Sequence, residues 1–203
     1  TMTVTASKYK KKPNDLYETE TWATDACIRA LNKLELWRAT PIWEPAAGNH
    51  AMVGPLAWAG ASDVITSDIT RYEHEHTAIF DFTTDQNPTF LPEQFDIVSN
   101  PPYGPSNRTA VKFAEKALQR CSGYVALLLT AKFDFGVTRQ HLFANNHRFA
   151  AKVSLLDRIS WEGNGETGTE DHAWYIWGPR NSEFQGARIL YEQNLSKGRT
   201  LLE

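Results

Sequence analysis

The chain has little cysteine: Cys27 and Cys121 are the only two among 203 residues, and they lie far apart. Neither belongs to a Cys-x-x-Cys pair, which argues against a disulfide framework and a structural zinc site, so we expect both to be small core residues. His74 and His76 flank Glu75, but no further cluster of His or Cys accompanies them. We therefore expect a solvated loop at this position and no metal site.

Long hydrophobic runs are also missing. The longest apolar stretch, residues 124–131, is far too short to cross a bilayer. Residues 1–12 lack the apolar segment of a secretory signal. These absences predict a cytoplasmic protein without a membrane partner.

An excess of positive charge is missing: 21 Lys and Arg against 24 Asp and Glu give a formal net charge of −3. Phosphate contacts dominate nucleic-acid affinity, so this balance counts mildly against tight DNA binding. One basic cluster, residues 8–12, favours contact with nucleic acid. We expect residues 1–13 to form a basic, flexible arm, either solvated or in contact with phosphates.

Strand-like runs alternate with helical stretches through the rest of the chain, without a repeat or a low-complexity linker. This order predicts a mainly parallel sheet covered by helices, in a single domain over residues 14–203. Helices are expected over 22–37, with Thr21 as N-cap, and over 50–59, 107–120 and 136–145. Strands are expected within 41–48 and over 63–68, 78–82, 95–99, 124–130, 150–159 and 172–177. The polar, glycine-rich segment 162–171 is expected to be a mobile loop.

The turn Asn100-Pro101-Pro102-Tyr103 follows the strand at 95–99, at the sheet edge where open α/β folds bind ligands. An amine on an aromatic ring is a poor nucleophile, because its lone pair is delocalised into the ring. An enzyme that methylates it must hold both N–H groups, and the Asn100 side-chain oxygen and the Pro101 carbonyl are suitable acceptors. The prolines stiffen the turn, and Tyr103 offers a face on which a base can stack. The alternative is an ordinary proline-rich turn.

Three upstream segments predict a nucleotide-like ligand. The small residues from Glu44 to Gly48 allow close backbone approach, although G-x-G-x-x-G and a Walker lysine are absent, which argues against NAD and ATP. Asp68 lies 20 residues beyond Gly48 and is suited to accept ribose hydroxyls. Asp81-Phe82 could contact an adenine ring. The alternatives are a generic strand-turn-helix, an acidic strand cap and a plain turn.

Taken in order, these motifs resemble those of class I S-adenosylmethionine-dependent amino-methyltransferases, in particular the DNA adenine-N6 branch and its small, phage-like members without a separate target-recognition domain. The segment 15–22 is similar to the cofactor-binding segment of that branch, and the resemblance covers roughly residues 14–180. It implies a Rossmann-like α/β fold: a seven-stranded, mostly parallel sheet with one antiparallel strand, and helices on both faces. His50 departs from the pattern, because many relatives carry a second glycine there.

The resemblance also implies roles for single residues. S-adenosylmethionine would be the cofactor, and the residues expected to bind it are Tyr17, Thr19, Glu44, Pro45, Ala46, Gly48, Asp68, Asp81 and Phe82. The residues expected to hold the target amine are Asn100, Pro101, Pro102 and Tyr103. Arg108 and Trp161 are candidates for positioning the substrate, while Lys132, Arg139 and Arg158 are either phosphate contacts or surface charge.

The predicted function is therefore methyl transfer to the N6 amine of adenine in DNA. The turn serves any planar amine or amide, so the same chemistry on RNA adenine or on a protein glutamine amide is an alternative. A catalytically inactive binding module of the same fold is another. The segment 17–22 favours DNA, and a glutamine-modifying relative would usually carry an N-terminal helical domain. Oligomeric state is left open.

Overall fold

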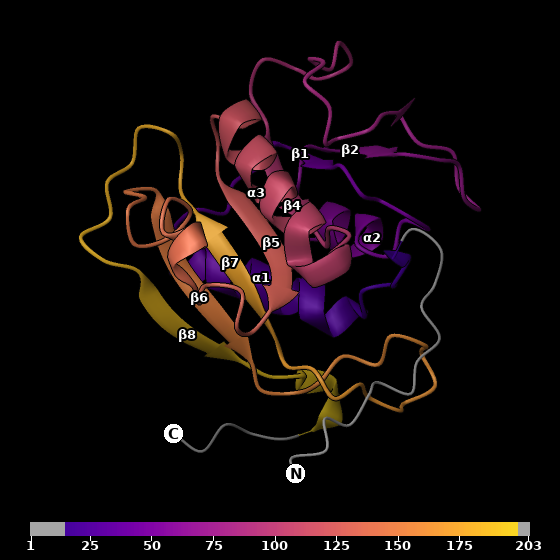
Figure 1. The fold of residues 1–203 in the computed structure, drawn as a ribbon. Helices are drawn as coiled ribbons and strands as arrows, with labels where there is room; N and C mark the ends of the chain where they lie inside the picture. Colours follow the sequence, from indigo (N-terminus) through magenta and orange to yellow (C-terminus); the bar gives the residue numbers. More distant parts are fainter. Residues whose placement is uncertain (1–14, 199–203) are drawn as a thin grey trace.

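The computed structural model describes residues 15–198, so the predicted arm at 1–13 lies outside the described residues. Within them, one sheet of eight strands has the order β3-β2-β1-β4-β5-β7-β6-β8 (Figure 1). The strands are β1 Pro41–Glu44, β2 Asp63–Asp68, β3 Ala78–Ile79, β4 Asp96–Ser99, β5 Val125–Thr130, β6 Phe149–Leu155, β7 His172–Trp177 and β8 Arg188–Glu192.

Strand β7 alone runs against its neighbours: it is antiparallel to β5 and β6, while the other described pairs are parallel. The predicted Rossmann-like α/β class with one antiparallel strand is thus confirmed. The expected count of seven strands is wrong, because β8 adds an edge strand parallel to β6. Within the described residues β8 is the last strand of the sheet, and its Ile189 and Tyr191 side chains are exposed, unlike those of an interior strand buried on both faces.

Helices cover both faces of the sheet, as predicted. They are α1 Thr21–Lys33, α2 Val53–Trp58 and α3 Arg108–Arg120. Figure 1 shows α3 in front of β4 and β5, with α1 behind the sheet. Neighbouring residues of a strand point to opposite faces, so Ile42 packs in the core with α1 while Trp43 packs in the core with α3. In β5, likewise, Leu128 packs in the core with α1 and Leu127 packs in the core with α3.

Two helix ends differ from the predictions. Thr21 is the first residue of α1 and the N-cap position belongs to Glu20, whose carboxylate accepts hydrogen bonds from Trp22 Nε1 at 2.9 Å and from the Ser160 amide at 2.8 Å. The helix ends at Lys33 rather than Trp37, because the backbone takes a φ of +57° at Glu35.

The helix predicted over 136–145 is wrong. A single 3-10 turn, Val137–Arg139, stands there, and the following residues form separate turns. Leu142 and Phe143 of this segment are buried in the core with Trp177 without belonging to a helix. None of the helices in the described part of the chain is long and apolar enough to span a membrane.

Candidate active site

Two adjoining cavities open at the carboxyl ends of β1, β2, β4 and β5. Cavity A holds about 910 Å³ and is lined by residues from 15–19, the end of β1 and its following turn, Asp68 and 80–83. Cavity B holds about 950 Å³ and lies between the turn after β4 and the loop before β7. Asp15, Tyr17 and Asn100 line both cavities, so they stand at the junction.

Glu44, the last residue of β1, places a buried carboxyl group in the wall of cavity A. Its Oε1 accepts hydrogen bonds from Ser99 Oγ at 2.6 Å and from the Ala46 amide at 3.2 Å. Its buried Oε2 has no hydrogen-bond partner within residues 15–198. Burial raises the pKa of Glu44 to about 8, so this carboxyl group is largely protonated at neutral pH.

The turn after β1 is fixed by Asp68. The Gly48 amide donates to Asp68 Oδ2 at 2.9 Å, and the Ile69 amide donates to Oδ1 at 2.7 Å. Gly48 has a φ of +48°, and a Cβ there would lie 2.7 Å from Leu16 Cδ1. The absence of a side chain at Gly48 therefore lets the segment 15–19 close over the cavity.

Asp81 and Phe82 line cavity A beside β3, and both also serve the local structure. Asp81 Oδ1 accepts from the amide and the hydroxyl of Thr83, each at 2.8 Å. Phe82 packs against Phe113 at 4.2 Å and Trp43 at 5.0 Å between ring centroids, and is only 2% exposed. Most of its ring is therefore occupied by core contacts.

The side chain of Asn100 is oriented by the segment that covers it. Its Nδ2 donates to the Tyr17 carbonyl at 3.2 Å and to Thr19 Oγ1 at 3.1 Å. No donor among the described residues engages Oδ1. With both amide hydrogens committed, the side chain presents a free acceptor at the junction of the cavities.

Aromatic rings form the wall of cavity B. Tyr103 stacks on His172 at 6.2 Å, His172 meets the Trp161 ring at 5.0 Å, and Trp161 meets Tyr17 at 5.9 Å. The Tyr103 hydroxyl donates to the Leu128 carbonyl at 3.2 Å, which anchors the turn to β5. Burial raises the pKa of Tyr103, so its phenol keeps its proton.

The structure brings most of the predicted site residues together. The nine residues predicted to bind the cofactor all line cavity A, as does Pro102. Asn100, Pro101, Tyr103 and Trp161 line cavity B. Arg108 lines neither cavity and is exposed on the first turn of α3. The role of each residue stays a prediction.

Sequence reasoning assigned no individual role to three residues of the site. Asp15 Oδ2 accepts from the Gly104 amide at 2.9 Å, which ties the N-terminal segment to the turn. Gly104, next to Tyr103, has a φ of +64°, and its position directly after the motif was the available signal. His172 gave no signal beyond its place in a strand, yet it lines cavity B.

His50, the departure noted in the sequence, has a φ of +65°. Its Nε2 lies 2.9 Å from His76 Nδ1, and its ring stacks on exposed His74. Among the described residues no group of three or more His, Cys, Asp or Glu is arranged to hold a metal. The histidines thus form a contact between two loops beside Asp68.

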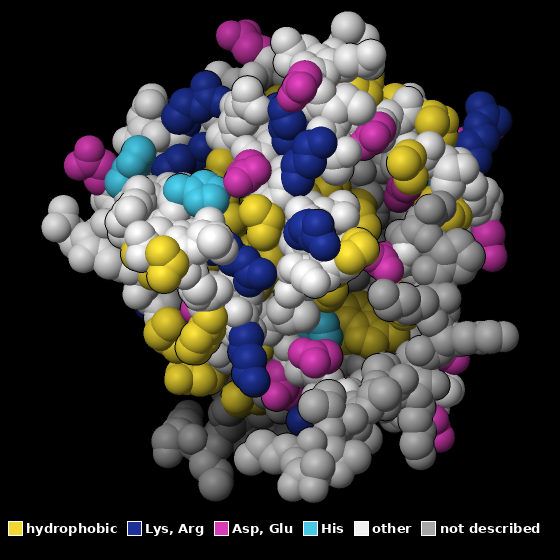
Figure 2. Space-filling view, viewed as in Figure 1, with side chains coloured by type: hydrophobic (Ala, Val, Ile, Leu, Met, Phe, Trp, Pro, Cys, Tyr) yellow, Lys and Arg dark blue, Asp and Glu magenta, His cyan; other side chains and the backbone are white. Residues whose placement is uncertain are grey.

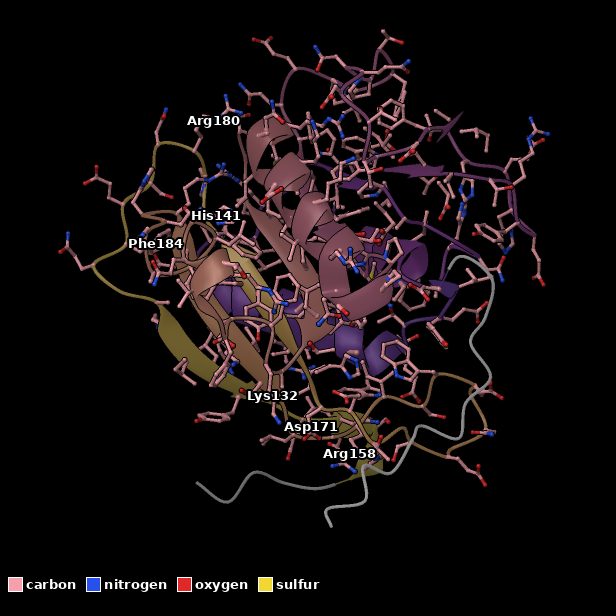
Figure 3. The ribbon with its side chains drawn as sticks, viewed as in Figure 1. Lys132, His141, Arg158, Asp171, Arg180 and Phe184 are labelled. Carbon is pink, nitrogen blue, oxygen red and sulfur yellow. The ribbon has the colours of Figure 1, made fainter. Side chains whose placement is uncertain are left out.

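Charges of both signs surround the site. Figure 2 shows Lys and Arg side chains over α3 and the segments beside it, with Asp and Glu interspersed. Figure 3 shows Lys132, Arg158 and Asp171 at the end of the sheet toward which β5 points. Arg158 pairs with Asp171 at 2.8 Å, and Arg139 donates to the Phe133 carbonyl, so two of the three candidate phosphate contacts also have local partners.

The comparisons with known proteins identify the fold. No family model and no curated protein sequence matches the chain. A Pyrococcus horikoshii protein assigned as an RNA methyltransferase is similar over 85% of this chain and 93% of its own, with 17% identity and a TM-score of 0.62. The methyltransferase subunit of a Streptococcus thermophilus type I restriction-modification system matches 95% of this chain, with 12% identity and a TM-score of 0.61.

A Listeria monocytogenes protein assigned as a class I S-adenosylmethionine-dependent methyltransferase matches 87% of this chain, with 13% identity and a TM-score of 0.55. The chain spans 65% of the Listeria protein and 50% of the Streptococcus subunit. The eight-stranded sheet, its single antiparallel strand and these likenesses agree: the chain has the Rossmann-like fold of class I S-adenosylmethionine-dependent methyltransferases.

Proposed function

We propose that this chain transfers the methyl group of S-adenosylmethionine to the N6 amine of adenine in DNA. The observation that carries the proposal is Asn100, which stands between two cavities with both amide hydrogens engaged and Oδ1 free. A methyl donor in cavity A and an amine in cavity B would meet at this residue.

Cavity A is lined by a turn of small residues and by acidic side chains, both of which suit S-adenosylmethionine. Asp68, at the end of β2, would accept the ribose hydroxyls in addition to the Gly48 and Ile69 amides, and the turn at Gly48 would allow backbone approach. The cofactor carries a positive sulfonium and an ammonium group. Glu44 supplies a carboxyl group in the same wall with one oxygen unpartnered, which a cation would engage.

Cavity B suits a flat acceptor with an amine. Asn100 Oδ1 and the Pro101 carbonyl would take the two amine hydrogens, which directs the lone pair toward the methyl group. S-adenosylmethionine bound in cavity A would supply an activated methyl group on its sulfonium sulfur, whose leaving group is a neutral thioether, and the amine oriented by Asn100 and Pro101 would lose its proton to water. The rings of Tyr103 and Trp161 provide apolar surface for a base that has left its stack.

The structural likenesses support a nucleic-acid acceptor without choosing one. The Streptococcus subunit belongs to a restriction-modification system, and the Pyrococcus protein is assigned to RNA. The acidic residues Asp15 and Glu170 in the wall of cavity B do not favour a phosphate inside it. This arrangement fits a base that enters the cavity while its backbone stays outside.

The test is transfer of a labelled methyl group to unmethylated DNA, structured RNA and total protein in parallel. Label recovered from DNA as N6-methyldeoxyadenosine is the expected result. Label in RNA or protein alone would keep the chemistry and replace the acceptor. If the cofactor binds in calorimetry but no acceptor is labelled, the enzymatic proposal is wrong and a binding module of the same fold stands in its place.

Cofactor binding is expected to release a proton from Glu44. Burial raises its pKa to about 8, and a cationic ligand favours the carboxylate, so the affinity for the cofactor should rise with pH from neutrality and level off above about 8. Calorimetry in buffers of different ionisation enthalpy measures the released proton directly.

The Glu44→Gln variant should remove both the proton release and the pH dependence. Glu93→Gln, a change at an exposed position, is the matched control and should behave as the wild type. Equal proton release by wild type and Glu44→Gln would show that another group is responsible.

A further inference from the structure

His172 has an unexplained polar atom in the wall of cavity B. It is the first residue of β7 and pairs with Thr130 at the carboxyl end of β5. The side chain lines the cavity and is 5% exposed, and its buried Nδ1 makes no hydrogen bond of standard geometry within the described residues. The Glu170 backbone and the Asp171 carboxylate act on the charge of the ring. Buried polar atoms nearly always have a partner, so an orphan in a cavity wall indicates a contact that a ligand completes.

The ring of His172 is held in place by its neighbours. Tyr103 lies against it at 6.2 Å with an interplanar angle of 26°, and Trp161 meets it at 5.0 Å and 77°. The residue therefore cannot turn away from the cavity without disturbing two other rings of the same wall. A fixed ring is suited to recognition, because little freedom is lost when a ligand binds.

The ring is also neutral. Burial lowers the pKa of His172 to about 4, so it carries one N–H donor and one lone pair through the physiological range. A neutral ring suits a cavity that receives an uncharged base. It can donate one hydrogen bond without placing a buried charge beside the cationic methyl donor.

We propose that Nδ1 of His172 donates a hydrogen bond to a ring nitrogen that flanks the target amine, and so distinguishes an aromatic base from other amine acceptors. This inference rests on the proposed function, in which Asn100 and Pro101 hold the amine itself. In adenine, N1 and N7 lie on either side of the carbon that bears N6, and both are acceptors. The base would then be held by three hydrogen bonds, two on the amine and one on the ring edge.

The experiment removes the two partners of the proposed hydrogen bond, the His172 donor and the ring nitrogen of the base, separately and together. DNA in which every deoxyadenosine is replaced by its 1-deaza or its 7-deaza analogue needs no knowledge of a recognition site. Methyl transfer to these and to normal DNA, all single-stranded, is compared for the wild type, His172→Phe and His172→Asn. The asparagine amide nitrogen lies near the position of imidazole Nδ1, so His172→Asn keeps a donor there.

For the wild type, one of the two analogues should lower kcat/KM by about tenfold, the effect of one lost hydrogen bond. His172→Phe should lose about tenfold on normal DNA and show no additional loss on that analogue. His172→Asn should regain part of the activity and part of the discrimination. His141→Phe is the matched control, since His141 is exposed, lines neither cavity and lies away from Lys132 and Asp171 in Figure 3.

The outcomes separate the two proposals. If the wild type labels DNA and His172→Phe discriminates the analogues as well as the wild type does, the role of His172 is wrong and the proposed function stands. If only RNA is labelled, the same comparison is made with deaza-substituted RNA. The role of His172 is then wrong if His172→Phe discriminates those analogues as well as the wild type does. Label in protein alone overturns the ring-nitrogen contact, and no label in any acceptor overturns both proposals.

Discussion

Replacing Asn100 by alanine should lower kcat by about 10²–10³-fold, the range seen when one preorganised polar contact to a reacting group is removed. The substitution deletes Oδ1, the free acceptor at the junction of the two cavities. It also deletes the Nδ2 donor to the Tyr17 carbonyl and Thr19 Oγ1, so cofactor affinity should fall modestly as well. Single-turnover transfer and calorimetry measure the two effects separately.

Asn100→Asp separates the acceptor from the donor. The carboxylate keeps an acceptor for the amine and loses the N–H groups that hold the segment 15–19. This variant should therefore show weakened cofactor binding like that of Asn100→Ala, with a much smaller loss of kcat. Asn87→Ala, at an exposed loop position, is the control. Equal kcat for the alanine and aspartate variants would remove Oδ1 from the mechanism.

Replacing Gly104 by alanine should lower kcat/KM by about 10²-fold, because a displacement of about 1 Å in a positioning element has that effect. Gly104 has a φ of +64°, and its new Cβ would lie 2.8 Å from Thr109 Cβ and closer still to Thr109 Oγ1. The turn must shift, and with it the Gly104 amide that donates to Asp15 Oδ2. Tyr103 and Pro101, which belong to the same turn, would then move from their positions relative to Asn100.

A matched control exists for the backbone strain alone. Gly198 has the same φ of +64° and open space where a Cβ would stand, and it lies outside both cavities. Gly198→Ala should lose stability by about 1–2 kcal/mol and keep its activity. Gly104→Ala combined with Thr109→Gly should recover part of the lost activity, and failure to do so would trace the loss to strain rather than to the contact with Thr109.

The order of the strands along the chain follows from local patterns. The apolar run in 124–130 predicted a strand buried on both faces, and β5 is such a strand. Strands β2 and β7 have the predicted bounds, 63–68 and 172–177. These segments were predictable because strand propensity and burial act in the same direction on the same residues.

The predictions are wrong for segments whose burial is set by distant parts of the chain and not by their own sequence pattern. The segment 136–145 was predicted to be a helix, yet its apolar residues at 142–143 fill the core from a series of turns. Strand β8 has three of its five residues exposed and, within residues 15–198, pairs with β6 alone. Its existence depends on a strand more than thirty residues earlier, which no local window contains.

By itself, the sequence determined the fold class and the position of the motifs, because parallel strands bring the residues at their carboxyl ends to one edge. Only the tertiary structure decided how those residues are used. It turned the Nδ2 of Asn100 toward Tyr17 and Thr19 and left Oδ1 free. It also set His172 between Tyr103 and Trp161 with Nδ1 in no hydrogen bond of standard geometry within the described residues. The partners of a hydrogen bond can come from distant parts of the chain, so the spacing of residues in the sequence does not predict which group a side chain will bond.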